Sequence, residues 1–569
     1  MKKSLKKRGQ KFITRFSRAS AKASEEGKEH LKENFIDRLS HVRNIRLLIL
    51  EWGLLVVALI MLAAAQAFWF SNSYSEDTFV AGGTFTEATL GKINSLNPLF
   101  ATTSSEKTLS RLMFATLSTV DYSGHPGAGL AKYIHSDENG RIWTIKLKDN
   151  LKWSDGEPIT NEDVIFTVKL IQNPAVTSVY DANLNNVKIS ESEGGEIVFT
   201  LSVPYADFIS ALNFPLVPHH ILKDADAKTL VEHPFSLSPV TSGAFSFNAI
   251  QSVSTDGEKI IYLSANPHYY NGKPMLNSFA VHAFLSTDNI INALNSGAVA
   301  ATAELDATDA DKITSSAIYQ RNSSLASGTF IFFNTKRVTD KGVRNAIRDH
   351  LDTKVLRTLA GNATALDYPL LSAQLSLNFP ALPAHSTEEA TNIGNGTALE
   401  LATVNSGYLP TVADFTAGML RAMGFTVNLT VYEENQEFIT NIIANRSYDL
   451  LIYEIELGAD PDILPYYHSS QASISGLNLS NYRNLLVDDL LVAGRETLDP
   501  ALRAKKYETF LNYWISDTPA IGLYQSELSY FYNKNTRIFG NDVRLITPLD
   551  RFSDVTSWSA VKAARNRTP

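Results

Sequence analysis

Residues 143–171 read WTIKLKDNLKWSDGEPITNEDVIFTVKLI, and this stretch decides the fold. Apolar and polar residues alternate from Arg141 to Lys148, which predicts a β-strand with one buried face. Residues 153–156 have the composition of a turn, and Thr160 with Asp163 forms a capping-box pattern at the start of a helix. A strand, a turn and a helix are therefore expected in direct succession.

The second half of the chain alternates between helix and strand patterns. Val343, Ile347 and Leu351 share one face of a predicted helix. From Leu399 onward the expected order is a strand, a helix capped by Thr411 and Asp414 and ending at Gly424, a strand over residues 425–431, a helix containing Ile439 and Ile443, and a strand over residues 450–453. This alternation predicts an α/β fold in which helices cover a parallel sheet.

A candidate binding residue follows the last of these strands. Residues 454–460 come directly after it, and ligands of open α/β sheets bind beyond the carboxyl ends of the strands. The carboxylate of Asp460 suits an ammonium group, because charge-assisted hydrogen bonds from such a group are strong. The alternative is that Asp460, which precedes Pro461, only begins a turn or caps the next helix.

The N-terminal region has the charge pattern of a membrane anchor. Residues 1–46 hold 14 basic and 5 acidic side chains, and residues 47–70 form an apolar run whose only charged residue is Glu51. As a helix this run would be about 36 Å long, enough to cross a bilayer. The positive-inside rule places residues 1–46 in the cytoplasm, and Trp52 and Trp69 lie where an interfacial aromatic belt is expected.

These patterns predict a single-pass protein of the cell membrane. We expect a basic cytoplasmic segment over residues 1–46, a transmembrane anchor over 47–70, a linker over 71–81 and an extracytoplasmic domain after it. The alternative is a cleaved signal peptide, because residues 65–67 (Ala-Gln-Ala) resemble a cleavage site. The basic region and the apolar run are both longer than a signal peptide normally has.

Composition argues against several classes of function. The residues after the apolar run hold 37 basic and 53 acidic side chains, so this part is acidic and nucleic acid is not an expected partner. The chain has no cysteine. This excludes disulfides, thiolate zinc sites, cysteine nucleophiles and a lipid anchor attached to cysteine.

The sequence lacks common motifs for catalysis and metal binding. It has no His-Glu-x-x-His pair, no Gly-x-Ser-x-Gly elbow and no complete phosphate-binding loop. His219 and His220 are adjacent, so in an extended segment their side chains point apart, and residues 136–140 form the pattern of a hairpin turn rather than a calcium loop. We therefore expect no enzyme activity, no catalytic residue, no metal site and no cofactor.

Several motifs together resemble one family. Residues 130–164, which include most of the stretch quoted above, are similar to the signature region of the family 5 extracytoplasmic solute-binding proteins, the oligopeptide, dipeptide and nickel binders of ABC importers. Further similar segments are residues 94–99 (NSLNPL), 218–222 (PHHIL), 241–245 (TSGAF), 333–335 (FNT), 343–347 (VRNAI), 482–484 (YRN), 488–491 (DDLL) and 517–521 (DTPAI). The resemblance covers about residues 80–560.

The resemblance implies an α/β fold of two lobes, the type II (cluster C) periplasmic-binding-protein fold, preceded here by one transmembrane helix. It implies a lobe 1 over residues 82–330 with an inserted subdomain over 115–234, a lobe 2 over residues 331–524, and a return to lobe 1 over residues 525–569. The chain would cross between the lobes near residues 328–333 and 522–532, and the ligand would be enclosed between them.

The resemblance also implies binding residues. Peptide binders of the family hold the peptide α-ammonium with an aspartate that follows a Trp-x-Ala sequence. Leu457, Gly458, Ala459 and Asp460 match this motif at Ala459 and Asp460, whereas Leu457 departs from the tryptophan, so its aromatic contact is missing. A second segment would line the cleft with Asn478, Asn481, Tyr482 and Arg483, of which Arg483 is a candidate partner for a carboxylate.

The function implied is that of a membrane-anchored substrate-binding protein of a bacterial ABC transporter. It would capture short peptides by hinge closure between the lobes and deliver them to permease subunits, as a monomer held to the membrane by residues 47–70. Two alternatives stay open. The ligand of the same transporter class is a metal complex or an oligosaccharide, or the protein is an anchored sensor without transport.

Overall fold

A computed structural model describes residues 46–566, apart from residues 122–123, 254–256, 387–391 and 542. The chain divides into a large unit, Phe79–Lys562, and a second unit that contains the described residues before and after it. The large unit has the two-lobed α/β fold expected from the sequence, and the second unit contains the predicted anchor.

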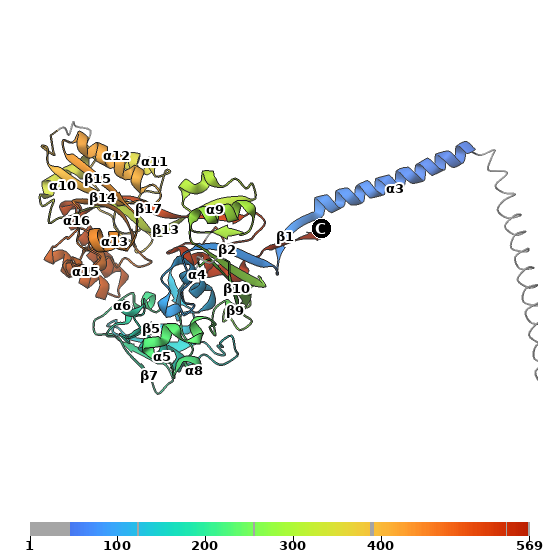
Figure 1. The fold of residues 1–569 in the computed structure, drawn as a ribbon, viewed down its shortest axis with the longest axis horizontal. Helices are drawn as coiled ribbons and strands as arrows, with labels where there is room; N and C mark the ends of the chain where they lie inside the picture. Colours follow the sequence, from blue (N-terminus) through green and yellow to red (C-terminus); the bar gives the residue numbers. More distant parts are fainter. Residues whose placement is uncertain (1–45, 122–123, 254–256, 387–391, 542, 567–569) are drawn as a thin grey trace, which may run out of the picture. The chain divides into compact units, whose positions relative to one another are not determined.

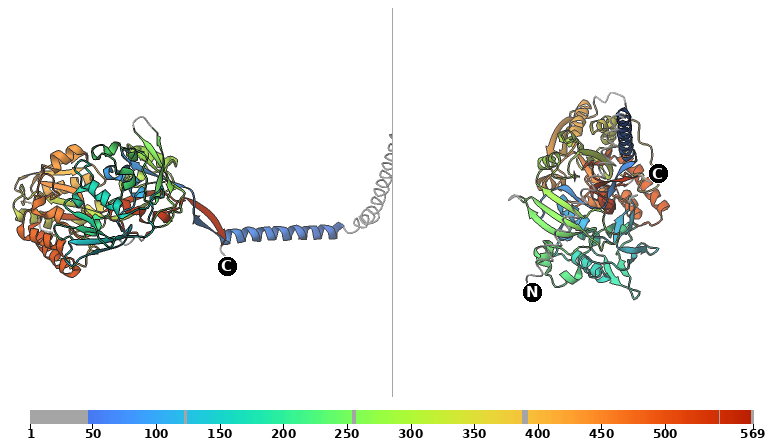
Figure 2. Two further views of the ribbon diagram at one scale, coloured as in Figure 1. Left: turned by 90° about the horizontal axis from the view of Figure 1, so that it is seen from below. Right: turned by 90° about the vertical axis from the view of Figure 1, so that its right-hand side faces the viewer.

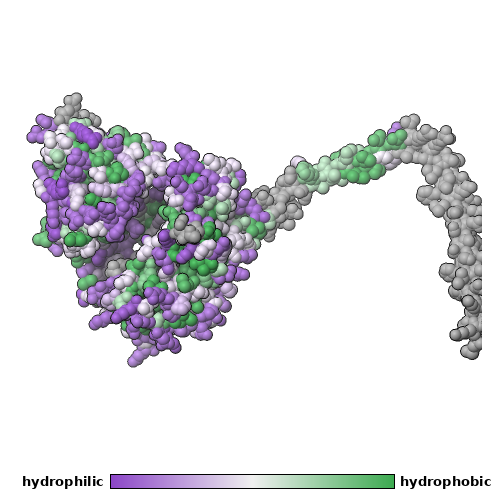
Figure 3. Space-filling model, in the orientation of Figure 1, coloured by the Kyte–Doolittle hydropathy of each residue, from purple (hydrophilic) through white to green (hydrophobic). Residues whose placement is uncertain are grey.

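Helix α3 (Arg46–Tyr74) contains the apolar run. Residues Leu50–Trp69 have a mean hydropathy of 2.0, and in the described part of the chain this is the one helix long and apolar enough to cross a membrane. Its apolar surface is visible in Figure 3. The predicted linker, residues 71–81, contains the end of α3 and strand β1 (Ser75–Val80), which pairs with β18 (Val561–Asn566).

A ten-stranded mixed sheet runs through the large unit. In spatial order its strands are β15 (Thr426–Tyr432), β14 (Ala398–Val404), β16 (Leu450–Glu456), β13 (Ile318–Phe333), β17 (Ala520–Asn533), β12 (Ala301–Thr302), β2 (Thr84–Leu90), β11 (Ser278–Phe284), β10 (Lys259–Ala265) and β9 (Phe245–Ser252). Strands β14, β15 and β16 are parallel, as predicted from the alternation of strands and helices, whereas β13 is antiparallel to β16 and β17.

Two large hydrophobic cores define the two lobes. The core of lobe 1 includes Leu325 and Leu528, and the core of lobe 2 includes Ala326 and Tyr524. Strands β13 and β17 pair with each other along most of their length, so both pass from one core into the other. Figure 1 shows these two strands between the helices of lobe 2 and the rest of the large unit.

The inserted subdomain contains the strand, turn and helix predicted from residues 143–171. Its four-stranded sheet has the order β5 (Ala131–Ser136), β6 (Ile142–Leu147), β8 (Ile197–Thr200) and β7 (Lys188–Glu191), and α5 (Asn161–Ile171) follows β6 in the chain. The predicted capping box is present, with Thr160 and Asp163 at the start of α5. Figures 1 and 2 show this subdomain in teal and lobe 2 in yellow to orange as neighbouring bodies.

The helices of lobe 2 follow the predicted order with one correction. They include α10 (Lys341–His350), α11 (Thr353–Leu359), α12 (Leu409–Ala422), α15 (Leu485–Glu496) and α16 (Pro500–Asp517). The capping role predicted for Thr411 and Asp414 is wrong, because α12 begins at Leu409 and both residues lie inside it. Pro410 explains the earlier start, since its fixed φ suits the first helical turn and its missing N–H costs nothing there.

The remaining helices and strands are short. They are η2 (Pro98–Phe100), α4 (Ser104–Met113), β3 (Ser118–Val120), β4 (Pro126–Ala128), α6 (Asp181–Leu184), α7 (Phe208–Ala211), α8 (His219–Leu222), η3 (Ala227–Glu232), η4 (Pro234–Ser236), α9 (Thr287–Ser296), η5 (Ala307–Lys312), α13 (Gln436–Phe438), η6 (Ile439–Ile443), α14 (Leu464–Tyr467), η7 (Ser469–Gln471) and η8 (Pro548–Ser557).

Candidate ligand-binding cleft

The segment after β16 carries Asp460 to the boundary between the lobes. β16 ends at Glu456, and the N–H groups of Leu457 and Gly458 donate to the carbonyl of Ala326 at 2.7 and 3.1 Å. Gly458 has a φ of +71°, which a residue with a Cβ adopts only with strain. The chain therefore turns away from the sheet at the point where β13 changes from one core to the other.

The side chain of Gln374 forms hydrogen bonds with the backbone of this turn. Its Nε2 group donates to the carbonyls of Leu457, Gly458 and Asp460 at 2.9, 3.0 and 3.0 Å. The side chain of Leu457 is buried in the core of lobe 2, and Ala459 packs against the same core. Leu457, which stands where peptide binders of the family have a tryptophan, therefore contributes to the packing of lobe 2.

Asp460 has a cationic partner within lobe 2. Both of its carboxylate oxygens accept hydrogen bonds from the guanidinium of Arg503 on α16, with Oδ1 2.5 Å from Nη2. The carbonyl of Gly494 fixes Arg503 by accepting from its Nε at 2.7 Å. Burial acts to lower the pKa of Arg503, but the Asp460 carboxylate holds this pKa above its ordinary value. The pair is thus a buried, bidentate ion pair.

A second ion pair lies beside the first, and its arginine also contacts the inserted subdomain. Asp462 accepts from Arg495 of α15, with Oδ2 2.7 Å from Nη2. The Arg495 guanidinium lies 5.4 Å from the ring centre of Tyr205, and the Arg495 carbonyl accepts from the N–H of Ala206 at 2.8 Å. Tyr205 and Ala206 belong to the inserted subdomain, so these contacts join the two sides of the cleft.

Asp207 faces the same group of charges from the inserted subdomain. Its carboxylate accepts from the Ser210 hydroxyl at 2.8 Å. Burial, followed by the negative charge of Asp460, raises the pKa of Asp207 well above its ordinary value. Burial also raises the pKa of Tyr205.

The other predicted binding segment lies at the opposite end of β16. The Asn481 amide donates to Asn334 Oδ1 at 3.1 Å, and Asn334 follows the end of β13, where its N–H donates to the carbonyl of Asp449 at 2.9 Å. Asp449 precedes the first residue of β16. A seven-residue strand rises about 3.3 Å per residue, so roughly 20 Å separates this end from the turn with Asp460.

The side chains of this segment are engaged within lobe 2. Asn478 donates to the carbonyl of Tyr482 at 2.8 Å, and the Tyr482 hydroxyl donates to Asp517 at 2.7 Å. Arg483 donates to the carbonyl of Ala472 at 3.1 Å. The structure therefore brings Leu457, Gly458, Ala459 and Asp460 together, and it does not bring Asn478, Asn481, Tyr482 and Arg483 to them.

A cavity of about 550 Å³ opens between the lobes, and Ala373, the residue before Gln374, forms part of its wall. Lobe 2 contributes residues between 364 and 373, β17 contributes Gln525, and the chain that returns to lobe 1 contributes Arg544. Figure 3 shows a recess between lobe 2 and the rest of the large unit. The recess is the candidate ligand-binding cleft.

The adjacent histidines lie away from this cleft. The extended segment predicted for them is wrong, because His219 and His220 begin the short helix α8. His220 pairs with Asp155 at 2.9 Å, and His219 lies 3.4 Å from Glu162. Among the described residues no group of three or more His, Cys, Asp or Glu side chains could hold a metal ion.

Sequence reasoning missed Gln374, Arg495, Arg503 and Asp207. Arg503 is 43 residues from Asp460, and no motif has a spacing that connects them. One signal was usable, because Arg503 shares a helix face with Tyr507 and Phe510, and a charged residue on an apolar face needs a buried partner.

Comparison with known proteins shows the family. Residues 125–475 match the bacterial extracellular solute-binding proteins, family 5. This chain belongs to that family. The match covers more than half of the chain, including most of the inserted subdomain and the turn with Asp460, so the protein is a solute-binding protein.

Two relatives of this solute-binding protein have similar lengths. The oligopeptide-binding protein AppA of Bacillus subtilis is 24% identical over 512 residues, which cover 83% of this chain and 92% of AppA. The probable D,D-dipeptide-binding periplasmic protein DdpA of Escherichia coli is 24% identical over 448 residues, which cover 72% of this chain and 81% of DdpA.

Solved structures of related binding proteins share the fold. The substrate-binding protein CtaP of Listeria monocytogenes has a TM-score of 0.74 at 21% identity and covers 84% of this chain and 100% of its own. AppA of Bacillus subtilis, in complex with a nonapeptide, has a TM-score of 0.68 at 20% identity, with coverages of 85% and 100%. NikZ of Campylobacter jejuni, in complex with Ni(L-His), has a TM-score of 0.68 at 20% identity, with coverages of 84% and 99%.

Proposed function

We propose that this solute-binding protein captures short peptides between its lobes by hinge closure. The passage of β13 and β17 from one core into the other carries the proposal, because bending these two strands moves lobe 2 as a body and leaves both cores intact. A ligand that contacts both lobes stabilises the closed form by its higher affinity for that form. AppA, named as an oligopeptide-binding protein, supports peptide as the ligand class.

Asp460 is the residue that we propose for the peptide α-ammonium, with Leu457, Gly458 and Ala459 shaping the turn that presents it. A carboxylate has about four lone-pair sites, and a bidentate arginine occupies two of them. The ammonium would therefore share the carboxylate with Arg503. The hydrogen bonds of Asn478, Asn481, Tyr482 and Arg483 support a role in the packing of lobe 2, so the proposed site does not include them.

The segment that contains α3 is proposed to anchor the protein in the cell membrane. Residues 1–46 would lie in the cytoplasm, residues 47–70 would cross the bilayer, and the binding domain would be extracytoplasmic. Anchoring raises the effective concentration of a monomeric binding protein at its ABC permease partner. No catalytic step belongs to this function.

A metal complex is a second candidate ligand. The structure of NikZ with Ni(L-His) has the same TM-score, 0.68, as that of AppA with its nonapeptide. The fold is therefore compatible with both kinds of ligand.

Native mass spectrometry tests this function on the full-length protein, purified from cells in detergent. We expect release of the bound solute to give a set of short peptides. A single nickel chelate would favour the second candidate. Failure to retain any member of an added mixture of short peptides would overturn the peptide proposal.

A further inference from the structure

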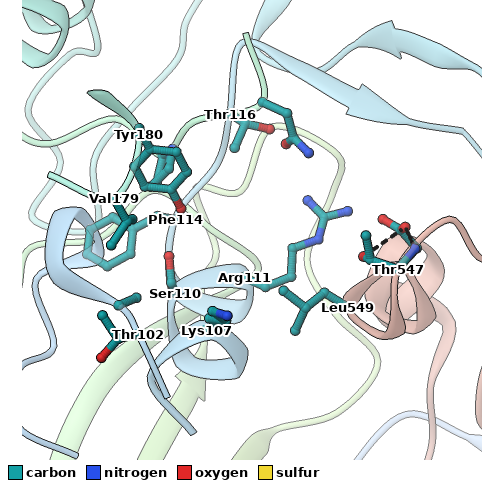
Figure 4. Close-up of a pocket in the computed structure, with 14 residues that line it drawn as sticks. Thr102, Lys107, Ser110, Arg111, Phe114, Thr116, Val179, Tyr180, Thr547 and Leu549 are labelled. Atoms are coloured by element: carbon teal, nitrogen blue, oxygen red, sulfur yellow. Dashed lines mark hydrogen bonds between the residues drawn. The ribbon is translucent and has the colours of Figure 1, made fainter. Parts of the chain in front are cut away.

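A second cavity, of about 500 Å³, lies on the lobe 1 side of the molecule. Helix α4, the inserted subdomain and the returning chain at η8 surround it (Figure 4). Lys107 and Arg111 stand one turn apart on α4, and both line the cavity. In Figure 4 the Arg111 side chain extends from α4 into the space between Thr116 and Thr547.

Neighbouring carboxylates are already engaged with the backbone. Glu106, beside Lys107, accepts from the N–H groups of Asn94 and Thr102 at 2.8 and 2.9 Å. Asp550, on the opposite wall, accepts from the N–H and the hydroxyl of Thr547 at 2.8 and 3.1 Å. Both carboxylates therefore accept hydrogen bonds from donors other than the two cations.

Lys107 and Arg111 have no ion pair within the part of the chain that the structure describes. A long hydrogen bond, 3.4 Å, joins Arg111 Nη2 to the Thr119 hydroxyl. Two cations on one wall of a cavity repel each other unless an anion lies between them. Their arrangement fits a carboxylate, which accepts two parallel hydrogen bonds from a guanidinium.

Apolar groups form another part of the wall. They are Phe114, Val179, Leu549 and the ring of Tyr180. Burial raises the pKa of Tyr180 to about 12, and its hydroxyl shares a hydrogen bond with the Ser110 side chain. Cationic and apolar surfaces together suit an anionic group attached to an apolar side chain.

The cavity begins close to the boundary between the lobes. Thr547, one of its lining residues, follows Ile546, whose side chain packs into the core of lobe 2. The Ile546 carbonyl accepts from the N–H of Ala326 at 3.1 Å, where β13 changes core. A ligand held between the lobes is therefore within reach of the cavity.

We propose that this cavity binds a carboxylate of the captured solute through Arg111 and Lys107, with the adjoining apolar group of the solute against Phe114, Val179 and Leu549. The inference rests on the proposed function and goes further by assigning the charge and polarity of the ligand part that lobe 1 binds. The carboxylate comes either from a peptide C-terminus or from an Asp or Glu side chain.

A pair of small probes tests the cavity without a peptide. Calorimetry or ligand-observed NMR on the full-length protein in detergent compares 3-phenylpropionate with 3-phenylpropanamide, which differ in the carboxylate alone. We expect the acid to bind at least tenfold more tightly. Arg111→Gln should remove this preference, Arg111→Lys should keep part of it, and Lys107→Gln should reduce it several-fold.

Arg141→Gln is the matched control, because Arg141 is exposed and does not line the cavity. It should leave the preference unchanged. Equal affinities for the acid and the amide in the unmodified protein would overturn the inference. A preference that survives Arg111→Gln would overturn it as well.

Three peptides identify the source of the carboxylate. They carry a free C-terminus, a C-terminal amide, or a C-terminal amide with an internal Glu, and their affinities are compared before and after Arg111→Gln. If no peptide binds while the acid probe still depends on Arg111, the proposed peptide function fails and the anion site stands. If all three bind equally well, peptide capture stands and the inference about lobe 1 fails.

Discussion

Leu325 and Ala326 are adjacent in β13, yet Leu325 packs in the core of lobe 1 and Ala326 packs in the core of lobe 2. The carbonyl of Ala326 also anchors the turn that carries Asp460, through the N–H groups of Leu457 and Gly458. The boundary between the lobes and the candidate site therefore share one residue. Any bending of β13 at this point would move the carboxylate of Asp460 relative to lobe 1.

Gly522 lies where β17 passes close to the lobe 2 segment around Leu366. A Cβ added at Gly522 would lie 2.3 Å from the Leu366 carbonyl oxygen and 2.8 Å from the Asp367 carbonyl carbon. Because both are backbone atoms, neither can move aside alone. We expect Gly522→Ala to lower the free energy of unfolding by about 1–3 kcal/mol in urea denaturation.

Gly418 offers the matched control for this substitution. It lies inside α12, and a Cβ added there would meet no atom within 4 Å. Gly418→Ala should therefore raise the free energy of unfolding by about 0.5–1 kcal/mol. Equal changes for the two variants would contradict the close approach at Gly522.

Asp460→Asn tests how much the ion pair with Arg503 contributes to stability. The change removes the partner of Arg503, a buried charge, and we expect a loss of about 3–5 kcal/mol in the free energy of unfolding. The double variant Asp460→Leu with Arg503→Met should recover much of this loss, because no charge is then left unpaired. Urea denaturation measures both.

Peptide affinity then distinguishes the two roles of Asp460. If the carboxylate meets the peptide ammonium, the stable double variant should still bind peptide at least tenfold more weakly than the unmodified protein. Calorimetry with one purified peptide gives this ratio. A double variant with unchanged affinity would leave Asp460 with a structural role alone.

Asp207 should make stability depend on pH. Its pKa is raised in the folded protein by burial and by Asp460, while in the unfolded chain it stays near its ordinary value of about 3.9. Between these two pKa values the native state keeps a proton that the unfolded state releases. The free energy of unfolding should therefore fall as pH rises from about 4 through the raised pKa.

Asp207→Asn should flatten this dependence and leave the protein more stable at neutral pH than the unmodified chain. The measurement is urea denaturation at several values from pH 4.5 to 8. The control is Asp149→Asn, because the Asp149 side chain is 78% exposed and should leave the slope unaltered. A slope that survives Asp207→Asn would assign the effect to another group.

Glu87 and Arg551 form a buried ion pair between β2 and η8, with Glu87 Oε1 2.6 Å from Arg551 Nη2. The Tyr530 hydroxyl donates to the same carboxylate at 2.9 Å. Glu87→Gln should cost about 3–5 kcal/mol in the free energy of unfolding, because Arg551 is left charged in the core of lobe 1. Denaturation by urea, followed by tryptophan fluorescence, measures the loss.

A matched variant for this pair is Lys132→Gln, which breaks the ion pair of Lys132 with Asp149. The two side chains are 56% and 78% exposed, so we expect a change below about 1 kcal/mol. A large effect there, or a small one for Glu87→Gln, would contradict the difference in burial.

Local patterns in the sequence were sufficient to predict those strands and helix ends that are determined by residues close together in the chain. The alternation around Trp143 predicted β6, and Thr160 with Asp163 predicted the start of α5, because strand faces and helix caps use residues two to four positions apart. The start of α12 was misplaced, since Thr411 and Asp414 resemble a cap while Pro410 fixes the first turn.

The sequence determined that Asp460 follows a strand, because the short apolar run at residues 450–453 marks that strand. The partner of Asp460 was decided only by the tertiary structure. Arg503 reaches Asp460 because α16 lies beside the turn that follows β16, and Asp207 faces the pair because the inserted subdomain meets lobe 2 there. Contacts between residues so far apart in the chain depend on how whole elements pack, and no local spacing records that packing.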